Sequence, residues 1–379
     1  MATKIIFLLI PWITPVIFLL SAQIAVDYGV HGLLGFSIMG AISFIAIFFL
    51  QRKAIFSKFD DSFKNFLYSL YVIELCICIS IVIEIIIKES FYYFFSIINV
   101  LFIIVATVVF IFLQRINEKL SISIVISGLI FSFLIPTLVY LKVSIPTVYS
   151  GLHFLATDML KFNDRYTWLL VVTLGIILIA HQYLYHMFYY KGLDNQRAFT
   201  YLISSMVWLV VPISLGSLAF LAKAQAVWPD LSDQVSIMVI NRFGGQFGQM
   251  LFLVTSIFII ITLVTRMLKD FRKRSQFKGS LWLFVHFILP VIVAFSFKIT
   301  LLQVIIVFGL VWGPILGVVL GGSNMRKINI LGVIIGFSVS STLSIIYSLP
   351  IGILLGTAVS CFILRLVNYL SFHQSKATA

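Results

Sequence analysis

A carboxylate stands in the middle of a long apolar run. Glu74 lies in the segment YVIELC, residues 71–76. Inside a membrane a carboxylate is costly unless it is protonated, paired or turned toward a polar cavity. Glu74 is therefore a candidate for handling a proton or cation, or for binding a cationic or amide-bearing solute. The alternative is a neutral glutamate that hydrogen-bonds a neighbouring helix.

A second polar cluster interrupts another apolar run, in the segment HQYLYH, residues 181–186. His181 and Gln182 lie near the middle of that run, where they could line a pathway and hydrogen-bond a small polar solute. Hydrogen bonding between helices is the alternative. His181 and His186 are five residues apart, whereas a two-histidine metal site on a helix uses residues four apart. We therefore predict no metal site.

The first apolar run carries Pro11, Pro15, Trp12 and Gln23. Each proline leaves a backbone carbonyl without its helical partner. Such breaks occur in membrane helices where the backbone lines a cavity. Trp12 beside the prolines is either a ring that faces the substrate or an anchor at the membrane interface.

One two-residue pattern is also found in enzymes. His153 and Asp158 form H-x4-D, in which a histidine can act as a general base. A two-residue pattern arises often by chance, and the residues that would support catalysis are missing. We predict no catalytic residue and no enzyme, and keep as the alternative a polytopic membrane enzyme that acts on lipid-linked substrates.

Segments 142–167 and 223–246 would carry that chemistry. Both are predicted as outer loops that could partly cover the extracellular mouth, or simply connect helices. They hold the acids and aromatics Asp158, Asp164, Tyr166, Trp228, Asp230 and Asp233.

The composition shows which solvent surrounds these residues. Of 379 residues, 61% are hydrophobic and 10% are charged, whereas soluble domains carry about 25% charged residues. The solvent for most of the chain must therefore be lipid. The net charge of +13 comes from short basic loops, so nucleic-acid binding is not predicted. The three cysteines lie inside apolar runs, which excludes a disulfide framework.

Twelve apolar runs are long enough to cross a bilayer as helices, which need about 20 residues each. We predict an all-α integral membrane protein with about twelve transmembrane helices. The runs are 4–26, 31–50, 64–87, 92–113, 121–141, 168–189, 200–222, 247–265, 280–297, 300–321, 328–348 and 351–371.

Basic residues set the orientation. With the N-terminus inside, 19 of the 26 Lys and Arg residues fall in inside segments and 7 in outside segments. The positive-inside rule then predicts a multi-pass protein of the cell membrane with both termini cytoplasmic.

Several stretches, in this order, resemble the sodium:solute symporter family and within it the urea and polyamine branch. They are DYGVHG at 27–32, NQRA at 195–198, GPIL at 313–316 and NMRKIN at 324–329. The resemblance implies a leucine-transporter-type fold. Residues 1–145 and 146–322 would be two inverted five-helix repeats, and residues 323–379 two peripheral helices and a tail. The orientation agrees, because runs 4–26 and 168–189 would cross in opposite directions.

In that fold the first and sixth helices are broken near the midplane, and the substrate lies between them. By resemblance Gln23, Glu74, His181 and Gln182 line the cavity, with Trp12 as a further substrate-facing residue. The third, eighth and tenth helices would contribute as well.

The eighth helix departs from the family, which has a serine and threonine cluster that binds sodium there. The segment TSIFIIIT, residues 255–262, places Phe258, Ile259 and Ile260 at the positions that call for hydroxyl groups. Thr255, Ser256 and Thr262 are the remaining candidates for ion coupling, together with Glu74. If these hydroxyl groups do not replace the missing sodium ligands, sodium coupling is lost, and proton coupling or facilitated passage is favoured.

The sequence thus predicts a secondary transporter that works by alternating access. Its substrate would be a small polar solute such as urea, a polyamine or an amino acid, and it would use no cofactor beyond Na⁺ or H⁺. The nearest alternative fold is a transporter of the major facilitator type, with two six-helix halves in parallel orientation.

Overall fold

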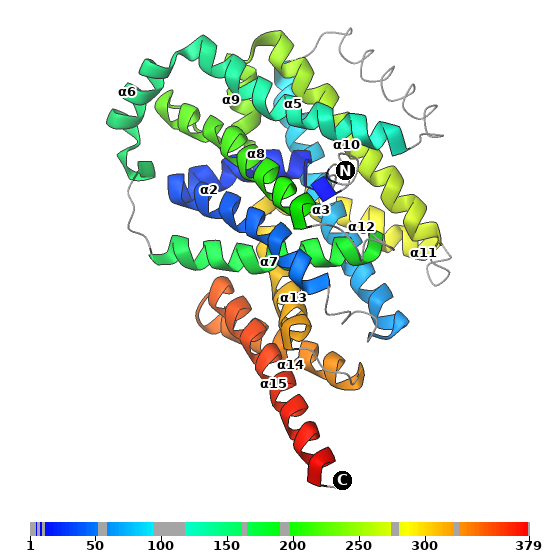
Figure 1. The fold of residues 1–379 in the computed structure, drawn as a ribbon. Helices are drawn as coiled ribbons and strands as arrows, with labels where there is room; N and C mark the ends of the chain where they lie inside the picture. Colours follow the sequence, from blue (N-terminus) through cyan, green and yellow to red (C-terminus); the bar gives the residue numbers. More distant parts are fainter. Residues whose placement is uncertain are drawn as a thin grey trace. The chain divides into compact units, whose positions relative to one another are not determined.

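A computed structural model describes residues 5, 8–9, 12–51, 59–93, 118–160, 165–189, 198–273, 280–321 and 326–377, all of them in helices or short connections (Figure 1). Within these ranges, nine helices are long and apolar enough to cross a membrane. The expectation of an all-α, multi-pass membrane protein is therefore confirmed. The nine candidate spans are Pro15–Leu50, Asp61–Glu89, Ile126–Val143, Tyr166–Phe188, Ala198–Ala224, Gly245–Val264, Leu301–Gly321, Lys327–Ile346 and Leu349–Leu370.

The nine spans of the described residues and the twelve predicted runs differ in three places. Runs 4–26 and 31–50 share one helix, α2 (Pro15–Gln51), which is kinked at Gly29. Run 92–113 lies almost wholly outside the described residues. Run 280–297 is divided into three short pieces, so it contains no single long helix. The count of twelve remains a prediction.

The kink in α2 requires a glycine. Gly29 has φ +65° and ψ −160°, a conformation that other residues rarely adopt. A Cβ atom there would also lie 2.6 Å from the carbonyl oxygen of Met159. The segment DYGVHG is therefore a tight connection between two helical pieces, packed against the loop that contains Met159.

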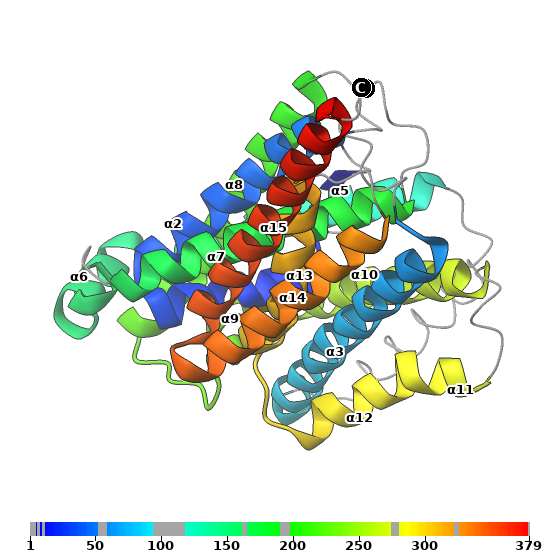
Figure 2. The same ribbon diagram turned by 90° about the horizontal axis from the view of Figure 1, so that it is seen from below.

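The divided run consists of α11 (Ser280–Leu283), a π-helical turn η6 (Phe284–Ile288) and α12 (Leu289–Ser296). Figure 2 shows α11 and α12 end to end. Pro290 lies in the first turn of α12, and the wider turn before it accommodates the missing hydrogen bond. His286 in this turn is buried and bonds the Trp282 carbonyl through Nδ1, at 2.8 Å.

The chain forms two compact units, which we describe separately. The first comprises Met1–Ser37, Val72–Asn163 and Val207–Leu302; the second comprises Ile38–Tyr71, Asp164–Met206 and Gln303–Ala379. Each unit combines segments of both expected repeats, so the division at residues 145 and 322 and the inverted symmetry remain predictions.

In the first unit, α2, α5, α8 and α10 pack around aromatic rings and hydroxyl groups. The Phe131 ring lies 5.2 Å from that of Phe18 and 5.6 Å from that of Phe252. Ser214 donates to the Ser132 carbonyl at 2.8 Å. The helices named here are α5 (Glu118–Val143), α8 (Ala198–Ala224) and α10 (Gly245–Lys273), and the unit also contains α6 (Ile145–Leu155), η3 (Thr157–Leu160), η4 (Ser232–Gln234) and α9 (Val235–Phe243). The part of α3 (Asp61–Tyr93) from residue 72 and the part of α8 from residue 207 belong to this unit, and their first residues belong to the second.

In the second unit, α13 (Leu301–Gly321), α14 (Arg326–Ile346) and α15 (Leu349–Ala377) pack through small residues. A Cβ on Gly336 would lie 1.8 Å from Ser360 Oγ, and Ser360 donates to the Gly332 carbonyl at 3.0 Å. Thr173 on α7 (Arg165–Tyr189) donates to the Pro350 carbonyl at 3.4 Å. The last two helices are thus closely packed elements of this unit.

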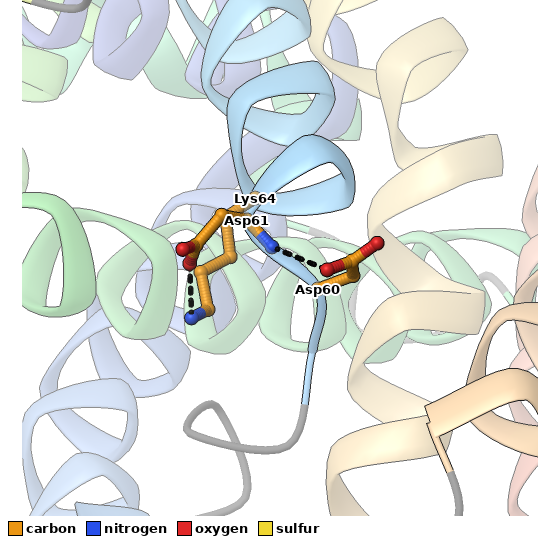
Figure 3. Close-up of polar contacts among 3 residues, drawn as sticks. All are labelled: Asp60, Asp61 and Lys64. Carbon is orange, nitrogen blue, oxygen red and sulfur yellow. Dashed lines mark hydrogen bonds and ion pairs between the residues drawn. The ribbon is translucent and has the colours of Figure 1, made fainter.

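The start of α3 is fixed by local polar contacts (Figure 3). The Asp61 amide donates to Asp60 Oδ1 at 3.1 Å, and Lys64 Nζ lies 2.9 Å from Asp61 Oδ1. Acceptors at a helix N-terminus satisfy its free N–H groups. The polar segment before run 64–87 therefore ends in a defined helix start.

Candidate functional site

In the second unit, two helices place aromatic rings beside His181, which lies on a third helix. Its ring centroid lies 5.7 Å from that of Tyr71 on α3 and 5.6 Å, in a T-shaped arrangement, from that of Trp312 on α13. All three residues lie within candidate spans. The imidazole of α7 is therefore held between two aromatic side chains at membrane depth.

Further rings extend this group. Phe188 lies 5.2 Å from Tyr68 and 6.0 Å from Tyr71, and Phe308 lies 6.4 Å from Trp312. We define the His181 cluster as Tyr68, Tyr71, His181, Phe188, Phe308 and Trp312. Its rings can attract a cation through their π faces, and the imidazole can donate or accept a hydrogen bond.

Two polar side chains adjoin His181 on α7. Gln182 is fully buried, and its amide can both donate and accept. His186 is buried and lies one turn further on, with its Nε2 3.2 Å from the Tyr201 hydroxyl. His186 is thus part of a contact between α7 and α8, which is the interhelical role considered for this segment.

The aromatic members of the cluster were not predicted from the sequence. Their spacing carried a signal, because residues three, four or seven apart share a helix face. Tyr68 and Tyr71 are three apart, Phe308 and Trp312 four apart, and His181 and Phe188 seven apart. In a chain with 15% aromatic residues, that signal does not distinguish a binding face from a lipid-facing one.

In the first unit, the N-terminal helix is interrupted as its prolines predicted. Residues 8–9 are helical, residues 12–14 form a turn, and α2 begins at Pro15. The Trp12 amide bonds the Leu9 carbonyl at 2.9 Å, and Thr14 Oγ1 accepts from the Ile17 amide at 3.5 Å. Thr14 and Pro15 are residue types that favour a helix start. Pro11 lies outside the described residues.

Trp12 is buried at this break. Its ring lies 5.5 Å from that of Trp208 on α8, edge to face, and Phe36 approaches the other side of Trp208 at 6.1 Å. Trp12 is only 7% exposed, and its role as an interfacial anchor remains a prediction. Its role as a substrate-facing ring remains a prediction.

The sixth helix differs from the resemblance. α7 is continuous from Arg165 to Tyr189, so the expected break at midplane is not found. The reason is in the sequence, because segment 165–189 contains no proline and only one glycine, Gly175. Any ligand at His181 and Gln182 would meet side chains of α7 rather than free backbone groups.

The helix-one break and α10 meet at Gly128 on α5. A Cβ there would lie 2.6 Å from Ile13 Cγ2 and 3.5 Å from Ile259 Cδ1. Ile259 thus fills space beside the break, where the family resemblance requires hydroxyl groups. An isoleucine supplies no oxygen ligand, and sodium needs several.

The three candidate hydroxyl residues on α10 differ in their hydrogen bonding and burial. Thr262 Oγ1 donates to the Phe258 carbonyl of its own helix at 2.9 Å. Thr255 is 8% exposed. Ser256 is fully buried, and its Oγ has no hydrogen-bond partner in the part of the chain that the structure describes. Ser256 is therefore the hydroxyl of this set that a buried ligand would satisfy.

Gln23 and Glu74 are both almost fully buried in the first unit. Gln23 Oε1 accepts from the Leu302 amide, at 3.1 Å, in the first turn of α13. Gln23 is thus a capping residue for α13, a contact that the sequence did not suggest. Because His181 and Gln182 belong to the other unit, one cavity lined by all four residues remains a prediction.

Of the H-x4-D pattern, the structure describes the side chain of His153 alone. His153 is exposed near the end of α6, and its ring lies 5.4 Å from Phe154. The side chain of Asp158 lies outside the described set. Within the ranges described, no three His, Cys, Asp or Glu residues gather as a metal site would require.

No protein-family model and no curated protein matches the chain. The likeness to the sodium:solute symporter family therefore rests on the motifs quoted above.

Proposed function

We propose that the chain is a secondary transporter that moves a small polar solute across the cell membrane by alternating access. The observation that carries the proposal is the His181 cluster. Ionisable and amide-bearing side chains inside membrane spans are costly, and they mark substrate or ion pathways. Here His181 on one span lies between aromatic residues from two other spans.

The proposed architecture has about twelve transmembrane helices, with both termini cytoplasmic. Ten of the helices would form two inverted repeats of five, as in the sodium:solute symporter family. The interruption at residues 12–14 is consistent with that scheme, since broken helices line substrate sites in such transporters. The continuous α7 would contribute through its side chains.

The proposed substrates are cationic or amide-bearing solutes such as polyamines, urea or amino acids. The rings of Tyr71 and Trp312 suit an ammonium group, which gains about 0.5–2 kcal/mol over an aromatic face. His181 and Gln182 suit an amide or carboxylate through hydrogen bonds. The polar groups of His181 and Gln182 do not favour a larger apolar molecule.

For coupling, we propose proton-driven or facilitated passage rather than sodium symport. Ile259 lies beside Ile13 at the helix-one break, and Thr262 bonds its own helix. Glu74, 1% exposed within α3, is the proposed proton carrier. Thr255 and Ser256 would bind the ion if sodium were used after all.

The test is uptake of labelled urea, putrescine and proline into proteoliposomes, with sodium and proton gradients imposed separately. We expect flux of at least one solute. In His181→Gln, that flux should fall about tenfold, since one cationic or hydrogen-bonding contact is worth roughly 1.4 kcal/mol. Glu74→Gln should abolish any flux that a proton gradient drives.

His153→Gln is the matched control, because this histidine is exposed on α6. Uptake in this variant should equal that of the wild type. A normal flux in His181→Gln, or no flux of any solute, would contradict the proposal. Loss of function in His153→Gln alone would favour the membrane-enzyme alternative.

A further inference from the structure

Two side chains from distant parts of the first unit hold the N-terminus of α13. Asp233 Oδ2 accepts from the Leu301 amide at 3.3 Å, and Gln23 Oε1 accepts from the Leu302 amide at 3.1 Å. Free amides and a positive helix dipole make this end attractive to an acidic or amide side chain. Segment 227–243, which contains η4 and α9, is thus docked on α13 through Asp233.

The docked carboxylate is incompletely satisfied. Asp233 is fully buried, and its Oδ1 has no hydrogen-bond partner among the residues that the structure covers. Ser236, in the first turn of α9, is also buried with an unpartnered Oγ. A buried anionic oxygen without a donor is costly. A proton on Oδ1 removes the charge, and so removes most of that cost.

A second acid adjoins this position. Ser232 donates to Asp27 Oδ2 at 3.0 Å, and the Gln23 amide also hydrogen-bonds Asp27. Asp27 and Glu84 both act on Asp233 with negative charge. The neighbouring basic groups act on these acids, because Lys223 attracts Asp27 and Lys88 pairs with Glu84. Two acids thus act on Asp233, and the backbone amides of Leu301 and of Asp233 itself oppose them.

We propose that Asp233 is a proton-binding residue whose protonation keeps segment 227–243 docked on the N-terminus of α13 and whose ionisation releases it. The ligand is a single proton, held on the orphaned carboxylate oxygen. The inference concerns docking and does not need transport, so it can fail or succeed independently of the proposed function.

The direction of the pH dependence follows from the carboxyl group. Burial, reinforced by Asp27 and Glu84, raises the pKa of Asp233 from 3.8 to about 6, although the amides of Leu301 and of Asp233 itself oppose the shift. A pKa raised in the docked state means that docking is fully favoured below about pH 4 and is lost as the pH rises through about 6. The shift of about two pH units corresponds to a roughly hundredfold change in the docking equilibrium.

The experiment is hydrogen–deuterium exchange of the full-length protein in nanodiscs between pH 4.5 and 8. The exchange rates are corrected for the intrinsic effect of pH on amide exchange, which is measured on unstructured peptides. In the wild type, protection of peptides from 227–243 and 299–303 should fall as the pH rises, with a midpoint at about pH 5, and should change little above about 6. In Asp233→Asn, which is neutral at every pH, these peptides should stay protected throughout. Asp230→Asn is the matched control, since Asp230 is exposed on the same segment, and it should behave as the wild type.

Asp27→Asn provides a second readout if Asp233→Asn does not fold. Removal of the neighbouring negative charge should move the wild-type midpoint to lower pH. Protection that is independent of pH in the wild type, or an unchanged profile in Asp233→Asn, would overturn the proposal. An unchanged midpoint in Asp27→Asn would do the same.

Discussion

The imidazole of His181 lies between two rings that differ in what they can offer a ligand. Trp312 is fully buried, and Tyr71 is 4% exposed with a polar hydroxyl at its tip. An indole face attracts cations more strongly than a phenyl face does. A change from indole to phenyl at position 312 would therefore reduce the attraction for a cation and keep most of the aromatic packing.

Trp312→Phe should weaken uptake of a cationic solute while the fold persists. The smaller ring keeps most of the packing but loses part of the cation attraction, about 1 kcal/mol or about fivefold in apparent affinity. The measurement is the concentration dependence of putrescine uptake in proteoliposomes. Trp168→Phe is the control, because Trp168 is 53% exposed on α7. Equal effects in both variants would show that the cluster does not contact the solute.

A substitution of Ser256 tests whether its hydroxyl group binds a coupling ion. Its hydroxyl is buried without a partner in the described part of the chain, and an unpaired buried hydroxyl costs about 1–3 kcal/mol. Ser256→Ala should therefore raise the midpoint of thermal unfolding or leave it unchanged. Uptake in NaCl and in KCl should be equal in the wild type and in the variant. A sodium-stimulated flux that Ser256→Ala abolishes would establish a sodium site on α10.

At the scale of elements, two helices with similar apolar composition behave differently. Segment 4–26 contains two prolines and is interrupted at residues 12–14, whereas α7 contains none and is continuous. The break could be predicted because proline removes a hydrogen bond whatever surrounds it. The break expected in α7 came from resemblance alone, with no local residue to produce it.

The pairing of α14 with α15 depends on close backbone approach. A Cβ on Gly336 would lie 1.8 Å from Ser360 Oγ and 2.9 Å from the Gly356 carbonyl. On the same helix, a Cβ on Gly332 would lie no closer than 3.4 Å to Leu364 or Val318. Small residues allow membrane helices to pack through dispersion forces, so these two glycines should respond differently to the same substitution.

Gly336→Ala should lower the unfolding midpoint in detergent, with a loss of about 1–3 kcal/mol from overpacking. Gly332→Ala should be neutral or slightly stabilising, because alanine favours the helix by up to about 1 kcal/mol. Thermal unfolding followed by cysteine-reactive dye measures both, since Cys76 and Cys78 are buried. Equal midpoints for the two variants would contradict the close approach of α14 to α15.

At the scale of the whole molecule, the class of protein could be predicted from the sequence, but the arrangement of the candidate site could not. Lipid as solvent follows from composition, and the long apolar helices follow from the lack of backbone partners in lipid. The position of His181 between Tyr71 and Trp312 depends instead on contacts between segments about 100 residues apart or more. Gln23 shows the same limit, because it accepts a hydrogen bond from the amide of Leu302, a residue that lies far from it in the sequence.

Orientation in the membrane is a property of the whole chain, and 19 of 26 basic residues favour cytoplasmic termini. This predicts that Asp61 lies inside and Asp230 outside. Both positions are exposed, so cysteines placed there should be reactive. In intact cells a membrane-impermeant maleimide should label Asp230→Cys, whereas Asp61→Cys should be labelled only after permeabilisation.

The native cysteines are the control for this labelling. Cys76 and Cys78 are buried and Cys361 is half-buried within α15, so the unmodified chain should remain unlabelled from either side. A reversed pattern would place segment 227–243 on the cytoplasmic face. Asp233 would then respond to cytoplasmic rather than external pH, and a proton gradient would drive the docked and released states in the opposite direction.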